Sequence, residues 1–113
     1  VGLNENMAKR ENIPYITGNS EVFSKEKSFP NSGILKLKIL FHEKNLQILG
    51  AQVVSNENVG WIVNMLSLAI LNKNTAEELS SIQYCGHPPQ IDVPSKMAVV
   101  LASEEVLFKK KIL

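Results

Sequence analysis

The sequence has few residues from which a covalent or metal-based site could be built. Its 113 residues include one cysteine and two histidines. A single cysteine excludes a disulfide within the chain, which favours a cytoplasmic location, where thiols stay reduced. A zinc site needs three or four ligands, and Cys85-x-His87 with a distant His42 does not match a known ligand spacing. We expect no metal site, and we expect His42 to be an exposed hairpin residue.

Charge of one sign and long apolar runs are also missing. Twelve basic and eleven acidic residues give a net charge of +1, without a positive stripe, so we expect no nucleic acid partner. The run Lys109-Lys110-Lys111 is interpreted as a solvated helix end. No apolar run approaches the roughly 20 residues that span a bilayer, so no membrane partner is expected. The chain also has no glycine-rich phosphate loop, and we expect no dinucleotide to bind this chain alone.

The length and composition suit one globular domain over residues 1–113, with 44% hydrophobic residues available for a core. The chain begins at Val1 rather than at methionine, and VGLNENMAKRENI reads as a continuing segment. We therefore expect this domain to be a fragment of a longer protein.

The N-terminal half predicts a short helix followed by strands. Asn4 suits the N-cap of a helix over 5–11, and residues 15–23 suit a strand with an irregularity at Gly18. A loop rich in Pro, Gly and Ser follows at 24–33. Apolar and polar residues then alternate over 33–42, which is typical of a strand with one buried face. Residues 42–45 form the turn.

The returning strand, 46–55, is apolar on both faces, so we expect it to be central in the sheet. Gly50 in its middle marks a bulge or a close approach of backbones. The first strand of this hairpin should direct its apolar side chains inward, and these are Leu35, Leu37, Ile39 and Phe41.

Three helices are expected after the hairpin. Residues 57–72, capped by Ser55-Asn56, carry an apolar arc wide enough to need two partners. Thr75 and Glu78 form a capping box that begins a short helix ending near Ile82. Pro94 suits the first turn of a last helix, whose inward side chains should be Met97, Val100, Leu101, Leu107 and Phe108. Strands followed by helices predict an α+β fold, an antiparallel β-sheet covered by helices.

The segment QYCGHPPQID, residues 83–92, gathers the groups most suited to chemistry. Cys85 and His87 would share one face of an extended segment, as a thiol nucleophile and its base need; alternatively Cys85 is a small, half-buried apolar residue. Pro88 and Pro89 fix the backbone after His87, and Asp92 could orient its imidazole for acid/base work. Otherwise Asp92 only caps the last helix, and His87 lies on the surface.

The order of motifs along the chain resembles a known family. VGLNENMAK is similar to the opening Val-Gly-Leu-Thr-Glu and short helix of the C-terminal dimerisation domain of FAD-dependent pyridine nucleotide-disulfide oxidoreductases. Gly33 with Leu35-Lys36-Leu37 resembles the family's Gly-Phe-x-Lys-Leu strand, and ILGAQVV at 48–54 resembles its Ile-Leu-Gly-x-x-Ile-Val strand. The apolar helix, Thr75-Ala76-Glu77-Glu78-Leu79 and His87-Pro88 follow in the family's order.

The resemblance implies a homodimer formed through this domain, with the apolar helix meeting the second subunit. FAD and NAD(P)H would bind domains upstream in the same protein, and neither cofactor would bind this fragment. In disulfide-reducing members, His87 would be the acid/base and Asp92 the orienting carboxylate, with His87 and Pro88 lying near the flavin of the partner subunit. The family's usual threonine is Pro89 here, and its glutamate is the shorter Asp92.

Related NADH oxidases and coenzyme A-disulfide reductases have a Pro-Pro pair without this histidine arrangement. Pro88-Pro89 favours those members. The alternative is therefore a purely structural oligomerisation domain whose histidine takes no part in catalysis.

Overall fold

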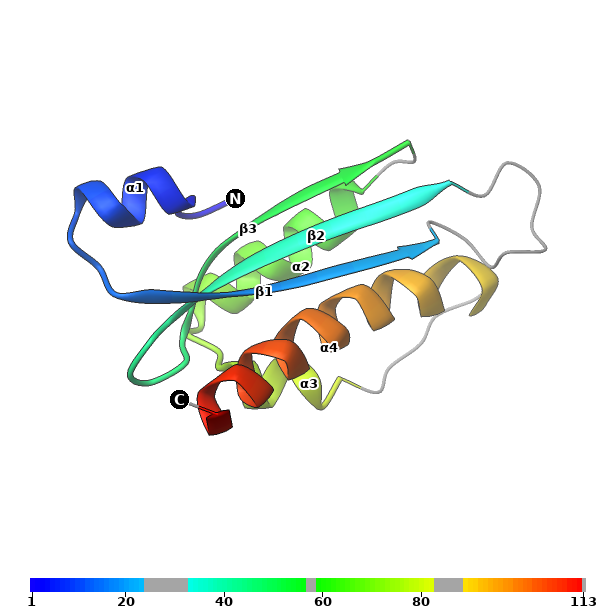
Figure 1. Ribbon diagram of the computed structural model, residues 1–113. Helices are drawn as coiled ribbons and strands as arrows, with labels where there is room; N and C mark the ends of the chain where they lie inside the picture. Colours follow the sequence, from blue (N-terminus) through cyan, green and yellow to red (C-terminus); the bar gives the residue numbers. More distant parts are fainter. Residues whose placement is uncertain (24–32, 57–58, 83–88, 113) are drawn as a thin grey trace.

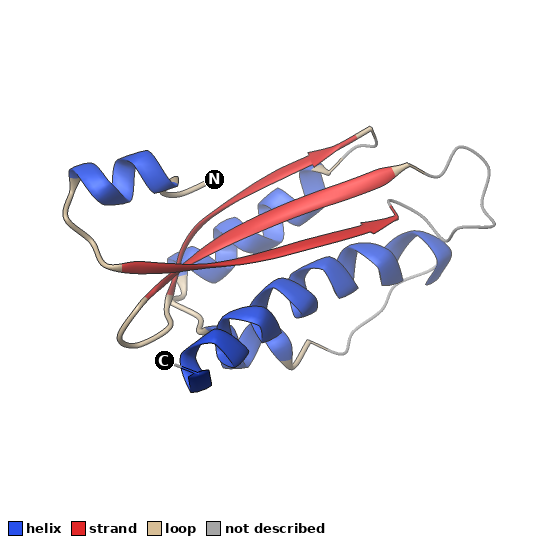
Figure 2. Cartoon of the chain, viewed as in Figure 1, coloured by secondary structure: helices blue, strands red, loops and turns tan. Residues whose placement is uncertain are grey.

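The fold is a three-stranded antiparallel sheet with helices on it (Figures 1 and 2), seen in a computed structural model that describes residues 1–23, 33–56, 59–82 and 89–112. For Phe23, residues 89–95 and Ile112 it describes the backbone alone. The strand order is β1-β2-β3. Along the chain lie α1 (Glu5–Arg10), β1 (Tyr15–Phe23), β2 (Ile34–His42), β3 (Ile48–Ser55), α2 (Gly60–Leu71), α3 (Ala76–Ser80) and α4 (Pro89–Ile112). The α+β prediction is confirmed.

β2 is the central strand. Its alternating apolar side chains are buried, as predicted, on the face that α2 and α4 cover, and they are Leu35, Leu37, Ile39 and Phe41. The prediction that β3 is central was wrong, because β3 lies at an edge. The N-terminal segment pairs with the edge of β3 away from β2: the Leu3 N–H donates to the Leu49 carbonyl oxygen at 3.0 Å, and Gly2 bridges Gly50.

Gly50 marks both a bulge and a close approach, as predicted. The register between β2 and β3 shifts at Leu40/Phe41, opposite this glycine. A Cβ added at Gly50 would collide with the backbone of Leu3. Glycine is therefore required here so that the N-terminal segment can lie against β3.

α1 contacts side chains on the other face of the sheet. The predicted N-cap is confirmed, since Oδ1 of Asn4 accepts a hydrogen bond from the Met7 N–H at 2.9 Å. Glu5 of this helix accepts a hydrogen bond from Nζ of Lys38 at 2.6 Å and from the Tyr15 hydroxyl at 2.9 Å. The pKa of Glu5 is lowered, chiefly by the hydrogen bond from Lys38. These contacts anchor α1 to two strands.

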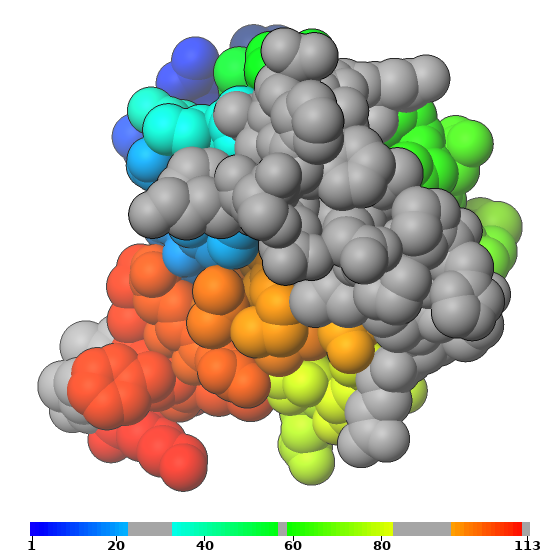
Figure 3. All heavy atoms as spheres, turned by 90° about the vertical axis from the view of Figure 1, so that its right-hand side faces the viewer, coloured from blue at the N-terminus to red at the C-terminus, as the bar shows by residue number. Residues whose placement is uncertain are grey.

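α4 lies across β1 and beside α3, as both the ribbon and the view from its end show (Figures 1 and 3). It begins at Pro89, earlier than the predicted start near Pro94. The predicted inward face is confirmed at Val100, which is buried, and at Leu107, which is partly buried against the core, but it was wrong at Met97, Leu101 and Phe108, which are exposed. The buried stripe is made of smaller residues, namely Ala98, Val99, Ala102, Ser103 and Val106.

Small residues face inward because α4 comes very close to β1 at Gly18. A Cβ added at Gly18 would collide with the carbonyl oxygen of Ala102. The predicted irregularity at Gly18 is absent, because the register from Tyr15 to Phe23 runs without a shift against β2. This glycine therefore makes room for a helix rather than for a bulge.

The lysines at the end of α4 were interpreted as a solvated end, and Lys110 and Lys111 are exposed, but Lys109 is half-buried and contacts the sheet. Nζ of Lys109 donates to the Thr17 carbonyl oxygen at 2.7 Å and pairs with Glu105 at 3.0 Å. Nζ of Lys110 donates to the carbonyl oxygen of Glu43. No helix in the described part of the chain has the length and apolar character to cross a bilayer.

Two short-range predictions for the helices had different outcomes. The capping box of α3 is confirmed, with the Glu78 N–H donating to the Thr75 hydroxyl oxygen and the Thr75 N–H to the Glu78 carboxylate. α2 instead begins at Gly60 with Val59 as its N-cap and no side-chain cap. Ser55 is the last residue of β3, so the pair Ser55-Asn56 does not cap α2.

Candidate functional site

The predicted chemical site lies mostly outside the described residues. Cys85, His87 and Pro88 fall in 83–88, which the structure does not describe. Asp92 is the fourth residue of α4, and only its backbone is described. The pairing of His87 with Asp92 and that of Cys85 with His87 therefore stay predictions.

His42 lies at the end of β2, where the hairpin was predicted. Its side chain is half-buried, and Nδ1 accepts a hydrogen bond from the Lys44 N–H at 3.2 Å. This hydrogen bond joins two residues of the same turn, so the His42 imidazole helps to hold the turn of the hairpin. Within residues 1–23, 33–56, 59–82 and 89–112, no three or more histidine, cysteine, aspartate or glutamate side chains gather to hold a metal ion.

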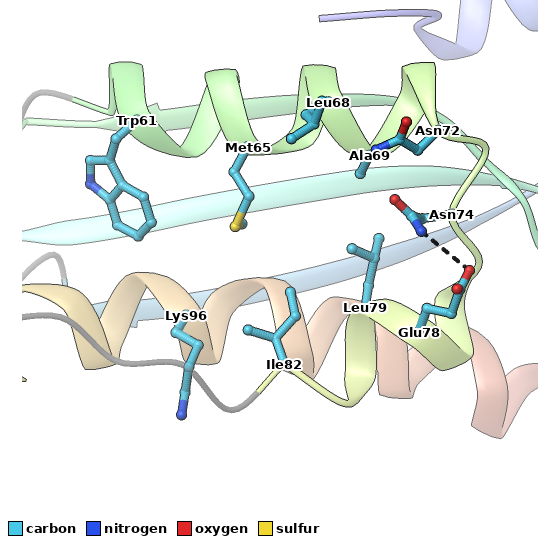
Figure 4. Close-up of a pocket in the computed structure, with 10 residues that line it drawn as sticks. All are labelled: Trp61, Met65, Leu68, Ala69, Asn72, Asn74, Glu78, Leu79, Ile82 and Lys96. Carbon is cyan, nitrogen blue, oxygen red and sulfur yellow. Dashed lines mark hydrogen bonds between the residues drawn. The ribbon is translucent and has the colours of Figure 1, made fainter.

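In the part of the chain that the structure describes, a groove of about 460 Å³ lies between α2 and the α3–α4 layer (Figure 4). Apolar side chains of α2 form one wall, and Leu79 and Ile82 form the facing wall. Lys96 of α4 lies near one end, and polar side chains of the α2–α3 region lie at the other. The lining residues are Trp61, Met65, Leu68, Ala69, Asn72, Asn74, Glu78, Leu79, Ile82 and Lys96.

α2 is apolar on more of its surface than the sheet can cover. Ile62, Leu66 and Ala69 are buried in the core, whereas Leu68 is 58% exposed and Leu71 is 77% exposed. Trp61, at the start of the helix, is also exposed. Single exposed apolar residues are ordinary, but several along one helix beside a groove indicate a contact surface. The predicted need for a second partner is therefore visible as an uncovered apolar face.

The far end of the groove carries a fixed negative charge. The Glu78 carboxylate accepts hydrogen bonds from the Thr75 N–H at 2.9 Å and from Nδ2 of Asn74 at 3.3 Å. Chiefly the backbone N–H of Thr75 lowers the pKa of Glu78, because a carboxylate that accepts hydrogen bonds is favoured over its protonated form. Glu78 is therefore ionised at neutral pH, and α3 holds it in place.

The arrangement of this groove suits association rather than chemistry. Its walls are apolar, and its charged groups lie at the two ends instead of converging on one point. Sequence reasoning found the α2 wall through the width of the apolar arc, but missed the facing wall. The signal for that wall was the capping box, which sets the phase of α3 and so turns Leu79 inward.

The decisive comparison is with protein-family models. Residues 1–98 match the model described as "Pyridine nucleotide-disulphide oxidoreductase, dimerisation domain". The chain belongs to this family. All the groove-lining residues fall within the matched part, as do His87 and Asp92.

Individual relatives agree with this membership. The chain is 30% identical to an NADH oxidase of Methanocaldococcus jannaschii over 109 residues, 96% of this chain and 24% of the relative. It is 33% identical to a coenzyme A disulfide reductase of Staphylococcus aureus over 61 residues, 54% of this chain and 14% of the relative. This dimerisation domain therefore spans about a quarter or less of the length of these curated relatives.

Solved structures support the fold. The water-forming NADH oxidase of Lactobacillus brevis, in a structure bound to NADH, superposes with a TM-score of 0.86 at 22% identity, over 98% of this chain and 24% of that one. At this identity the likeness concerns the fold alone. It agrees with the predicted sheet and helices of a pyridine nucleotide-disulphide oxidoreductase dimerisation domain.

Proposed function

We propose that this domain joins two subunits of a flavin-dependent NAD(P)H oxidoreductase into a homodimer through the groove side of α2. FAD and NAD(P)H would bind other domains of the protein, and the enzyme would act in the cytoplasm. The observation that carries the proposal is the uncovered apolar face of α2, with Trp61, Leu68 and Leu71 exposed in a domain of a dimerisation family.

The chemistry of this face suits a contact between proteins. Burying apolar surface contributes roughly 25 cal/mol per Å², and the centre of protein interfaces is rich in Trp, Met and other large apolar side chains. Trp61 and Met65 meet this description, and the polar groups lie at the ends of the groove, where the rim of an interface is expected. One short helix would therefore supply the centre of the contact.

The class of reaction is supported by the relatives' names. An NADH oxidase and a coenzyme A disulfide reductase are among the matched proteins, and the motif order in this sequence resembles FAD-dependent members of the family. The parent reaction would pass a hydride from the nicotinamide to the flavin and then electrons to an acceptor. The role of this domain would be to hold the two subunits together.

The test is a charge placed on α2. Leu68→Asp should convert the full-length protein from dimer to monomer in analytical ultracentrifugation, because a buried, unpaired carboxylate strongly opposes association. Leu68 is 58% exposed within one copy, so the fold should survive. Phe108→Asp, an exposed apolar position of α4 that does not line the groove, is the matched control and should stay dimeric. An unchanged dimer in Leu68→Asp would contradict the proposal.

A second candidate function is catalytic. We infer that His87 acts as acid/base towards a thiol in the partner subunit's active site, with Asp92 orienting the imidazole and Pro88 fixing the backbone next to it. The family match extends to residue 98 and so includes this segment. An imidazole with a pKa near neutrality suits proton transfer in both directions.

His87→Gln in the full-length enzyme separates the catalytic histidine from the purely structural domain. A loss of turnover of about a hundredfold or more, with the dimer intact, is expected of a general acid/base. Asp92→Asn should cause a smaller loss and shift the pH profile of turnover. Near-normal turnover in His87→Gln would leave this domain with a structural role only, as in the NADH oxidase-like alternative.

A further inference from the structure

β1 is an edge strand with features that favour pairing with another molecule. It has nine residues, Tyr15–Phe23, and its register against β2 runs without a shift. In the described sheet its one neighbouring strand is β2. A long, regular edge strand presents a row of backbone N–H and C=O groups to any strand that approaches, and proteins commonly block such edges. The edge of β1 therefore needs a blocking group if the protein is not to associate through it.

The opposite edge of the sheet is covered by backbone. Beside β3, the Ala51 N–H donates to the Val1 carbonyl oxygen at 2.9 Å, and Gly2 bridges Gly50. The N-terminal segment thus acts as a short additional strand on that side. On the other side of the sheet, helix α4 lies beside β1 (Figure 1), so side chains of a helix have to do what backbone does at β3.

Two side chains of α4 bind backbone groups of β1. Nζ of Lys109 donates to the Thr17 carbonyl oxygen at 2.7 Å, and Oε1 of Glu105 accepts a hydrogen bond from the Asn19 N–H at 3.3 Å. Residues two apart on a strand direct their backbone groups to the same side, so both groups belong to one edge. An antiparallel neighbour would place an N–H opposite the first group and a carbonyl oxygen opposite the second. Lys109 and Glu105 therefore stand in the positions of a strand's donor and acceptor.

Contacts within the chain hold this pair in position. Glu105 and Lys109 are four residues apart on one side of the helix, and Nζ of Lys109 lies 3.0 Å from Oε1 of Glu105. The Ser20 hydroxyl also donates to the Ala98 carbonyl oxygen at 2.6 Å, which fixes α4 beside the strand. The side chains of Lys109 and Glu105 are 39% and 37% exposed, and exposed ion pairs contribute little to stability. Their main effect is therefore to be sought outside the stability of the single chain.

We propose that Glu105 and Lys109 block the edge of β1 against β1 of a second copy, and so limit how many copies associate. An edge strand can pair with its own copy about a twofold axis, because both molecules then use the same surface. Asn19 is the middle residue of β1. A pairing centred there would set Thr17 opposite Glu21 and use the full length of both strands. The groove side of α2 takes no part in it, so the inference does not rest on the proposed dimer contact.

Removal of both side chains tests the proposal in the full-length protein. Glu105→Ala with Lys109→Ala deletes the acceptor and the donor, keeps α4 rich in good helix formers and leaves the net charge unchanged. Analytical ultracentrifugation should show species larger than the parent protein, in a share that rises with protein concentration. The matched control is Glu104→Ala with Lys111→Ala, which removes the same charges from exposed positions of α4 and should sediment like the parent.

A third change separates strand pairing from a general loss of stability. Asn19→Pro removes an N–H on the outer side of β1, where proline is tolerated in an edge strand. Added to the Glu105→Ala/Lys109→Ala variant, it should return the sedimentation to that of the parent, although it restores no contact with α4. Asn19→Lys, which places a charge on the edge, should have the same effect and serves if circular dichroism shows that the proline variant has lost its sheet.

Three outcomes would overturn the proposal. A Glu105→Ala/Lys109→Ala variant that sediments like the parent would mean that the pair blocks nothing. Larger species in the Glu104→Ala/Lys111→Ala control as well would mean that loss of surface charge, rather than an open edge, causes association. Larger species that persist after the change at Asn19 would mean that the new contact uses another surface.

Discussion

α2 and α4 cover the same face of one sheet, yet they are held there differently. α4 places small residues against β1 and adds polar ties: the Ser20 hydroxyl donates to the Ala98 carbonyl oxygen at 2.6 Å, and Lys109 donates to the carbonyl oxygen of Thr17. α2 packs large apolar side chains against the core from one side and leaves others exposed on the opposite side. Contacts within the chain thus fix α4, although it too exposes apolar side chains, whereas Trp61 and Leu68 are exposed on α2 where they line the groove.

The difference lies in the size of the residues at each contact. Small side chains allow two backbones to approach closely, so the helix position is determined by shape and by hydrogen bonds. Large side chains keep backbones apart and can be shared between an inner and an outer partner. A helix with a wide arc of large apolar residues is therefore suited to assembly, while one with a narrow stripe of small residues is suited to close packing against a strand.

Gly18→Val is the variant that should disturb the contact between α4 and β1 most. The added side chain would collide with the backbone of Ala102, and a backbone cannot move aside as a side chain can. We expect a loss of about 4 kcal/mol or more in the free energy of unfolding, at the upper end for a single substitution. Urea denaturation followed by circular dichroism measures this loss.

The control for that variant is its neighbour. Asn19→Ala changes an exposed side chain whose backbone N–H, and not its amide, donates to Glu105 at 3.3 Å. Its unfolding free energy should stay within about 0.5 kcal/mol of the parent. A Gly18→Val variant as stable as Asn19→Ala would mean that α4 does not depend on close approach to β1.

A pair of leucines tests whether α2 has an inner and an outer side. Leu66 is fully buried, and Leu68, two positions on, is 58% exposed. Leu66→Ala should lower the unfolding free energy by about 2 to 5 kcal/mol through lost burial and a cavity. Leu68→Ala should leave the stability of the monomer nearly unchanged and weaken the dimer.

The two leucine variants have to be compared at low and high protein concentration, because association stabilises the folded state by mass action. Leu68→Ala should lose stability mainly in the concentrated sample, whereas Leu66→Ala should lose it at both concentrations. Equal losses in the two variants at low concentration would remove the distinction between the inner and outer sides of α2.

The sequence predicted most of the local structure and the class of fold, but not the phase of α4. Alternation in β2, the caps at Asn4 and Thr75, and the arc of α2 each depend on neighbours in sequence, and these predictions were confirmed. The inward face of α4 was chosen by size, from Met97 and Leu101, and was wrong because Gly18, far away in sequence, admits only small residues. The predicted central position of β3 was also wrong, because the partners of a strand are distant in sequence. β2 pairs with one edge of β3, and the N-terminal segment pairs with the other.

The candidate site was predictable to a similar degree. The α2 wall of the groove followed from periodicity alone, whereas the opposite wall depends on how α3 and α4 fold back over the sheet. The role of His87 stays a prediction, because an acid/base site shared between subunits depends on atoms of a second molecule.

The smallest expected effect concerns the polar end of α4. Lys109 bridges the Thr17 carbonyl oxygen on the free edge of β1 and the carboxylate of Glu105. Both side chains of this ion pair are partly exposed, so Lys109→Met should cost only about 1 kcal/mol or less in unfolding free energy. Lys111→Met is the control that retains the Lys109 contacts, and it should lower the unfolding free energy less.

Salt separates the two kinds of contact that Lys109 makes. Because salt weakens exposed ion pairs, the difference in unfolding free energy between the two variants should shrink as the salt concentration rises. A difference that is the same at all salt concentrations would mean that Lys109 holds the edge of β1 through its hydrogen bond and packing, not through its charge.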